Sequence, residues 1–170
     1  MDDTLIGERA DLLQTLATHR NFLRFTARGL TEEQIRQRST ASELCIGGLL
    51  RHVAEVERTW AKFIVDGPGA FGTFDEPAMA AHQEGFQVGD GETLESLLAA
   101  YGSVASATDE LVRGLDDLGT SQPLPEAPWF QPGATRSARR VLMHVIAETA
   151  QHAGHADIIR EAIDGQKTMG

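Results

Sequence analysis

The chain has 170 residues, of which 41% are hydrophobic, enough apolar material for the core of one domain of ordinary size. Its 25 acidic residues outnumber its 15 lysines and arginines, and the resulting net charge of −10 disfavours nucleic-acid binding, which depends on clustered basic side chains. The longest apolar stretches are too short for a transmembrane helix, and the acidic start Met1-Asp2-Asp3 is unlike a signal peptide. We therefore expect one cytoplasmic domain over residues 1–170, without an internal disulfide because Cys45 is the single cysteine.

Apolar residues recur at helical spacing over four long segments, which predicts four amphipathic helices. Serine or threonine precedes three of these segments, and glycine ends or follows each of them. In chain order, the expected helices are Asp3–Arg28, a second from Thr40 or Ser42 to Asp66, a third from Thr93 to Gly114, and a fourth from Thr135 to Gly165. No segment shows the alternation of a strand. These elements favour an all-α four-helix bundle, either antiparallel or with a crossover connection.

The connecting segments differ in character. Residues 31–34 have the capping-box pattern of a short helical turn. Residues 67–91 are rich in glycine and phenylalanine and are long for a plain connector, so we expect them to form a wall or lid of a site, with a short helix at 76–83. Residues 119–133 contain four prolines and are expected to form a loop.

Polar residues interrupt the apolar stripe of the fourth helix near its middle. When the helix is projected at 100° per residue, Glu148, His152 and His155 fall on the stripe of inward-facing apolar residues, with His144 at its margin. Burying a carboxylate and two imidazoles without partners would cost several kcal/mol. A divalent cation would satisfy these groups.

The second helix offers a third ligand, because His52 lies at the edge of its apolar stripe. Glu148 and His152 are four residues apart, so their Cβ atoms are roughly 5–6 Å from each other, which suits two ligands of one ion. Together with His52 they make a set of two histidines and one carboxylate. Three protein ligands leave one position open, as in catalytic zinc sites, although iron, nickel or manganese would accept the same donors.

Other residues of the same types have simpler interpretations. His155 is the candidate catalytic residue: it could act as a general base, replace one of the ligands or, as we favour, support a ligand from behind. His19 and His82 are expected not to bind the metal. Cys45 is expected to be a small buried side chain, as free cysteines usually are.

Two segments carry a family resemblance. The segment Leu49–Trp60, LLRHVAEVERTW, resembles the second-helix motif of DinB-like metal-binding bundles. The segment Glu148–Glu161, ETAQHAGHADIIRE, followed by Ile163-Asp164-Gly165, resembles the fourth-helix signature of one branch of that superfamily. This branch is similar to mycothiol-dependent maleylpyruvate isomerase and to S-transferases that use mycothiol or bacillithiol.

The resemblance implies a four-helix bundle with a crossover connection and a metal pocket between the second and fourth helices. By position, the family's metal ligands match His52, Glu148 and His152. Many DinB-like proteins have histidine in place of Glu148, and the glutamate favours the mycothiol-linked branch. The isomerase has an additional domain that this chain lacks, so isomerase activity is not expected.

The implied function is that of a metal-dependent thiol S-transferase. Zinc, the expected metal, stabilises a bound thiolate near neutral pH, and a mycothiol-like cosubstrate would then attack an electrophile and detoxify it. The loops 67–91 and 123–132, including Trp129 and Phe130, would shape the electrophile pocket. The expected partners are this thiol and the electrophile, with no nucleic acid or membrane, and a homodimer is compatible with the sequence. The alternatives are a hydrolase or lyase that uses metal-bound water and a non-enzymatic metal-binding stress-response protein.

Overall fold

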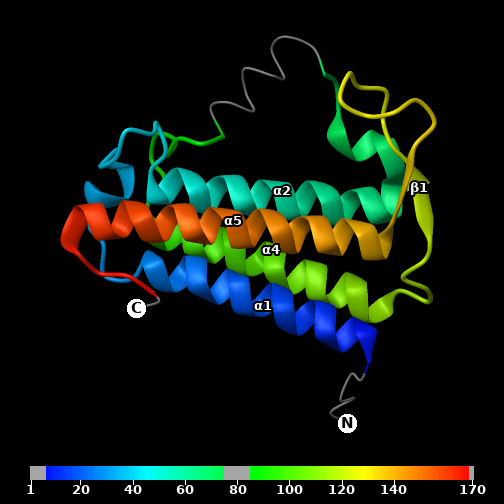
Figure 1. Ribbon diagram of the computed structural model, residues 1–170, viewed down its shortest axis with the longest axis horizontal. Helices are drawn as coiled ribbons and strands as arrows, with labels where there is room; N and C mark the ends of the chain where they lie inside the picture. Colours follow the sequence, from blue (N-terminus) through cyan, green and yellow to red (C-terminus); the bar gives the residue numbers. More distant parts are fainter. Residues whose placement is uncertain (1–6, 75–84, 169–170) are drawn as a thin grey trace.

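The computed structural model describes residues 7–74 and 85–168, which form a bundle of four long helices (Figure 1). These helices are α1 (Glu8–Thr26), α2 (Ile46–Asp66), α4 (Leu94–Gly114) and α5 (Ala138–Asp164). The short elements between them are η1 (Gln34–Arg36), η2 (Gly67–Phe71), β1 (Ser121–Pro123) and β2 (Thr135–Ser137). The all-α four-helix bundle predicted from the sequence is confirmed.

The chain crosses the length of the bundle between α2 and α4. Figure 1 shows α2 and α4 running in one direction and α1 and α5 in the other, so the connection from residue 67 to residue 93 joins opposite ends of the bundle. Helix α5 packs against both α1 and α2, and α2 also packs against α4. The expected crossover connection is therefore present. Among the described helices, none has the length and apolar character that a membrane span requires.

Helix α2 begins later than expected, at Ile46 rather than at Thr40 or Ser42. The Thr40 and Ser42 hydroxyl oxygens accept hydrogen bonds from the backbone N–H groups of Ser42 and Leu44, at 3.2 Å in both cases. These bonds close local turns, which compete with a helix for the same hydroxyl groups. The predicted end of the helix, Asp66, is confirmed.

Helix α5 begins at Ala138, and its capping residue is Ser137 rather than Thr135. The Ser137 hydroxyl oxygen accepts a hydrogen bond from the backbone N–H of Arg140, at 3.2 Å. Thr135 belongs instead to β2, which pairs antiparallel with β1. The sequence gives no sign of these strands, because strands of three residues are too short to show an alternating pattern.

The predicted cap of α4 at Thr93 and the predicted capping box at residues 31–34 are confirmed. Thr93 makes a reciprocal pair of hydrogen bonds with Ser96. Thr31 and Gln34 make a similar pair at the start of η1, with donor–acceptor distances of 3.0 and 3.2 Å. The expected helix start at Asp3 and the short helix expected at 76–83 lie outside the described residues.

A buried ion cluster joins three of the helices. The guanidinium of Arg20 in α1 donates to both carboxylate oxygens of Glu57 in α2, at 3.1 and 2.5 Å, and to Asp109 in α4, at 2.8 Å. Arg20 is 3% exposed and Glu57 is fully buried. The two hydrogen bonds within one pair fix the relative position of α1 and α2, because a guanidinium and a carboxylate fit in one plane.

Candidate metal centre

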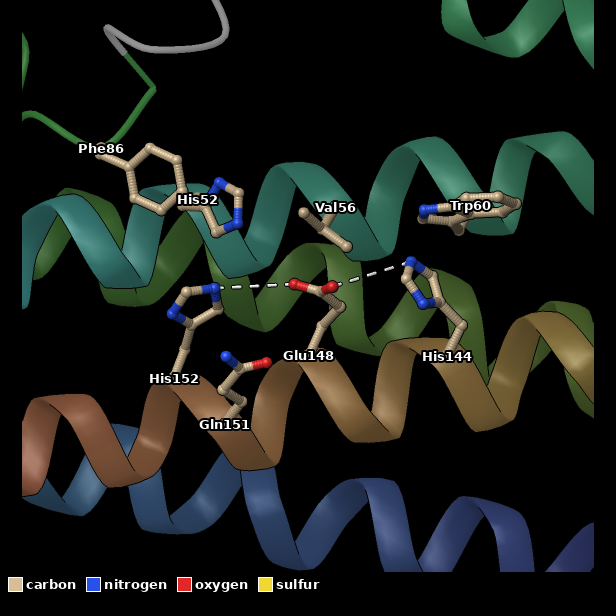
Figure 2. A pocket seen from close by; sticks show the side chains of 8 residues that line it. All are labelled: His52, Val56, Trp60, Phe86, His144, Glu148, Gln151 and His152. Carbon is tan, nitrogen blue, oxygen red and sulfur yellow. Dashed lines mark ion pairs between the residues drawn. The ribbon is translucent and has the colours of Figure 1, made fainter. Parts of the chain in front are cut away.

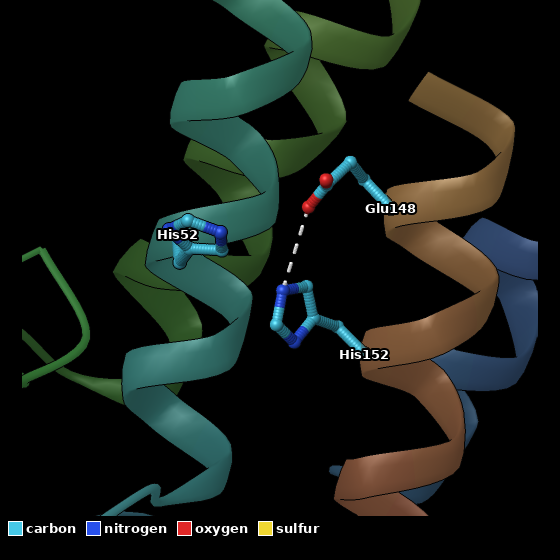
Figure 3. A group of neighbouring side chains, drawn as sticks. All are labelled: His52, Glu148 and His152. Carbon is cyan, nitrogen blue, oxygen red and sulfur yellow. Dashed lines mark ion pairs between the residues drawn. The ribbon is translucent and has the colours of Figure 1, made fainter. Parts of the chain in front are cut away.

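The three predicted ligands lie together between two facing helices. His52 extends from α2, and Glu148 and His152 extend from α5 toward it (Figure 3). One ligand atom from each residue lies within 4.8 Å of the other two. His152 Nε2 lies 3.6 Å from a Glu148 carboxylate oxygen. The structure therefore brings together the set that helical projection selected.

Burial and charge prepare these groups to act as ligands. Both histidines are buried, whereas Glu148 is half-buried. The adjacent imidazole of His152 lowers the pKa of Glu148, and the charges of His144, His152 and His52 add to this effect, which outweighs the opposite effect of burial. Glu148 is thus an ionised carboxylate at neutral pH, the form in which it binds a cation.

A cavity of about 360 Å³ opens beside the three side chains. Figure 2 shows Phe86 beside His52 at one end of the cavity and Trp60 with His144 at the other end. The lining residues are His52, Val56, Trp60, Phe86, His144, Glu148, Gln151 and His152. A further ligand of an ion held by His52, Glu148 and His152 would therefore have room in this cavity.

Phe86 reaches the cavity because α2 has a glycine beneath it. Its ring stacks on the His52 imidazole with centroids 3.8 Å apart. A Cβ atom on Gly48 would lie 1.8 Å from the Phe86 carbonyl oxygen, so only glycine allows this segment to approach α2. Phe86 belongs to the segment 67–91, and its position confirms that this segment contributes a wall of the cavity. The apolar periodicity of the sequence could not single out Phe86, because its position depends on the close approach of its backbone to Gly48 of α2, which is distant in the sequence.

His144 is more than the flanking polar residue that its place at the margin of the stripe suggested. It lines the cavity, and its Nε2 lies 3.9 Å from Glu148. Burial lowers the pKa of His144, the charges of Arg136 and Arg140 lower it further, and Glu148 opposes them. The signal in the sequence was the four-residue spacing between His144 and Glu148.

His155 lies behind His152 and is not among the residues that line the cavity. The Nδ1 atoms of the two rings are 3.3 Å apart, whereas the Nε2 atom of His152 is the one that approaches Glu148. His155 therefore contacts a candidate ligand from the side away from Glu148.

The other singled-out residues that the structure describes lie outside the cluster of His52, Glu148 and His152. His19 is on α1, with its ring edge-on to Phe22 at 6.1 Å. Cys45 is 5% exposed, which confirms that it is buried. Trp129 and Phe130 do not line the cavity. His82 lies outside the described residues.

Comparisons with known proteins agree with this architecture. A structure described as a conserved protein from Enterococcus faecalis superposes with a TM-score of 0.67 at 13% identity, covering 95% of this chain and 100% of that one. This likeness concerns the fold. Comparison with curated protein sequences gives no significant match. The family model for mycothiol S-transferases matches residues 11–165, which include both helices of the candidate metal centre. The chain therefore belongs to the mycothiol S-transferase family.

Proposed function

We propose that this chain is a metal-dependent S-transferase that binds one divalent cation, preferably zinc, through His52, Glu148 and His152. Its cosubstrate would be a low-molecular-weight thiol of the mycothiol type, and the acceptor an electrophilic carbon. The observation that carries the proposal is the meeting of three ligand atoms within 4.8 Å beside an open cavity. Membership of the mycothiol S-transferase family supports the choice of thiol.

The donor set fits a zinc ion. At zinc–ligand bonds of 2.0–2.2 Å, two ligands at a tetrahedral angle are ~3.3–3.6 Å apart, and the distance of 3.6 Å between His152 and Glu148 matches this spacing. Small side-chain rotations would bring His52 into the same arrangement. Two neutral imidazoles and one carboxylate leave a divalent ion with a net positive charge, which favours an anionic fourth ligand such as a thiolate.

The bound cation would supply the stabilisation that keeps a thiol ionised near neutral pH. The chain's own residues would hold the cation and shape the space around it. The ring of Phe86 covers His52, while the side chains of Val56 and Trp60 form an apolar wall of the cavity. Cys45 is buried, so the reacting sulfur would come from the cosubstrate. His155 would be a positioning residue that accepts a hydrogen bond from the Nδ1–H group of His152 and thereby keeps the Nε2 atom of His152 free to bind the cation.

The proposal predicts that conjugation of an electrophile such as monochlorobimane requires both the metal and the thiol. The sulfur–carbon bond forms as chloride leaves with the bonding electron pair. We expect zinc-loaded protein to accelerate the reaction of mycothiol, and metal-free protein to give only the uncatalysed rate. The measurement is bimane fluorescence over time, with Cys45→Ala as a control variant that should keep the activity.

A different outcome would support another function. If zinc-loaded protein hydrolyses an ester or amide without added thiol, and does not accelerate the bimane reaction, the hydrolase alternative replaces the transferase. If it binds metal and catalyses neither reaction, the chain is a metal-binding protein without this activity.

A further inference from the structure

Arg136 packs against Trp60, which lines one end of the cavity, and it forms no ion pair with any acidic residue that the structure describes. Arg136, in β2, places its guanidinium carbon 4.6 Å from the centre of the Trp60 ring and 5.4 Å from that of Phe130. Within residues 7–74 and 85–168, its Nη1 atom is buried and has no hydrogen-bond partner. A buried donor of a charged group that makes no hydrogen bond is unfavourable, so this atom is suited to receive a ligand.

Other arginines of the bundle show how such groups are normally satisfied. Arg20 is paired with two carboxylates, Arg139 with Glu8, and Arg160 with Asp164. Arg24 also has buried nitrogens without partners, but it packs over Tyr101, which does not line the cavity.

Burial lowers the pKa of Arg136, and the charge of Arg140 lowers it further. This direction is what an environment without a neighbouring anion produces. An anion bound beside Arg136 would reverse it.

The position of Arg136 links it to the reaction site. Trp60 lines the cavity, and so does His144, whose pKa the charge of Arg136 lowers. Figure 2 shows Trp60 and His144 at the same end of the cavity, beyond Glu148. A molecule reacting beside His52, Glu148 and His152 could extend from there toward Arg136.

The surroundings of Arg136 are aromatic. Trp60 contacts Phe71 at 4.8 Å, and Phe74 contacts Trp129 at 5.5 Å. These rings, together with Phe130, offer flat apolar surfaces. Such surroundings favour a ligand with a planar apolar body and one anionic group, since the guanidinium can bind a carboxylate in its own plane.

We propose that Arg136, with Trp60 and Phe130, forms a subsite for the carboxylate of the electrophile, and that the preferred electrophiles are aromatic or similarly planar carboxylic acids. This inference rests on the proposed S-transferase function and specifies its second substrate. The hairpin of β1 and β2 gives the subsite its position, because it holds Arg136 opposite Gln122 just before α5.

A matched pair of electrophiles tests the proposal. 4-(Bromomethyl)benzoate and 4-(bromomethyl)benzamide have the same reacting carbon and differ in charge at the far end. The thiolate forms a bond to the benzylic carbon, bromide leaves with the bonding pair, and the thiol proton passes to the buffer. With zinc and mycothiol, we expect kcat/KM to be about tenfold higher for the benzoate, the size of effect typical of one hydrogen bond to a charged group.

Variants separate recognition from folding. Arg136→Gln should abolish the preference by lowering kcat/KM for the benzoate while leaving the benzamide within about twofold, and Arg136→Lys should retain part of it. Arg140→Gln, at a neighbouring exposed arginine, should keep the full preference. Equal loss on both substrates in Arg136→Gln would show a purely structural role. A change confined to the KM of the thiol would place the carboxylate site on the other substrate. Either result overturns the proposal.

A binding measurement keeps the test independent of transfer activity. In metal-free protein, 4-methylbenzoate should quench tryptophan fluorescence at concentrations about tenfold lower than 4-methylbenzamide does, and Arg136→Gln should remove the difference. If this holds while no thiol is transferred, the proposed function fails and the subsite stands. If transfer proceeds but neither assay shows a preference for the carboxylate, the function stands and the subsite is wrong.

Discussion

Replacing His52 or His152 with alanine is expected to remove nearly all bound metal and, with it, thiol transfer. Each histidine supplies one of three ligand atoms that lie within 4.8 Å of one another. Removing either one leaves two protein ligands, which should bind the cation too weakly to retain it during dialysis. The measurement is metal content by mass spectrometry after dialysis, on protein purified without a histidine tag. Helical circular dichroism should be nearly unchanged, because we expect the large apolar clusters of the core to hold the bundle together without the ion.

A graded series sharpens this prediction. His155→Ala should keep the site but lower its metal affinity by roughly 10–100-fold, the usual cost of losing the partner that orients a histidine ligand. His19→Ala, at a histidine of α1 outside the site, should bind metal as the natural chain does. Full occupancy in the His52→Ala, His152→Ala double variant would show that the metal binds elsewhere.

Replacing Glu57 with alanine should destabilise the bundle by about 3–5 kcal/mol, the range expected when one partner of a buried ion pair is removed. Arg20 is 3% exposed and would lose two of its three hydrogen bonds to carboxylates. Asp109 alone would remain to balance its charge. The measurement is the free energy of unfolding from urea titrations followed by circular dichroism, at a fixed metal concentration.

A matched double variant identifies the cause. In Arg20→Met, Glu57→Leu, no uncompensated arginine is left in the core, so the loss should be smaller than in either single variant. Asp109→Ala should cost less than Glu57→Ala, because Asp109 is partly exposed and Glu57 is not. If the double variant is as unstable as the sum of the singles, packing rather than unpaired charge explains the effect.

The helical parts of the molecule were readable from the sequence because their signals are local. Apolar periodicity identified the four helices, and projection at 100° per residue placed His52, Glu148 and His152 on inward faces that the structure brings together. The start of α5 was misplaced because Thr135 and Ser137 are both suitable capping residues. The start of α2 was misplaced because its N-cap is Cys45, which makes no side-chain capping hydrogen bond and so gives no signal in the sequence.

The remaining features depend on contacts between distant segments. Phe86 lines the cavity because Gly48 allows its backbone to approach α2. Arg136 reaches Trp60 from a strand of three residues that no periodic pattern reveals. Glu57 shares a helical face with Val53 and Trp60, but the sequence does not show that Arg20 of α1 is the partner that allows its burial.

X-ray absorption at the zinc edge, with and without mycothiol, tests the central claim most directly. On zinc-loaded protein with the thiol, we predict three nitrogen or oxygen ligands at about 2.0–2.2 Å and one sulfur at about 2.3 Å. Without the thiol, the sulfur should be absent, because Cys45 is buried and is not among the three candidate ligands. A zinc site that gains no sulfur when saturating thiol is added would contradict the proposed mechanism.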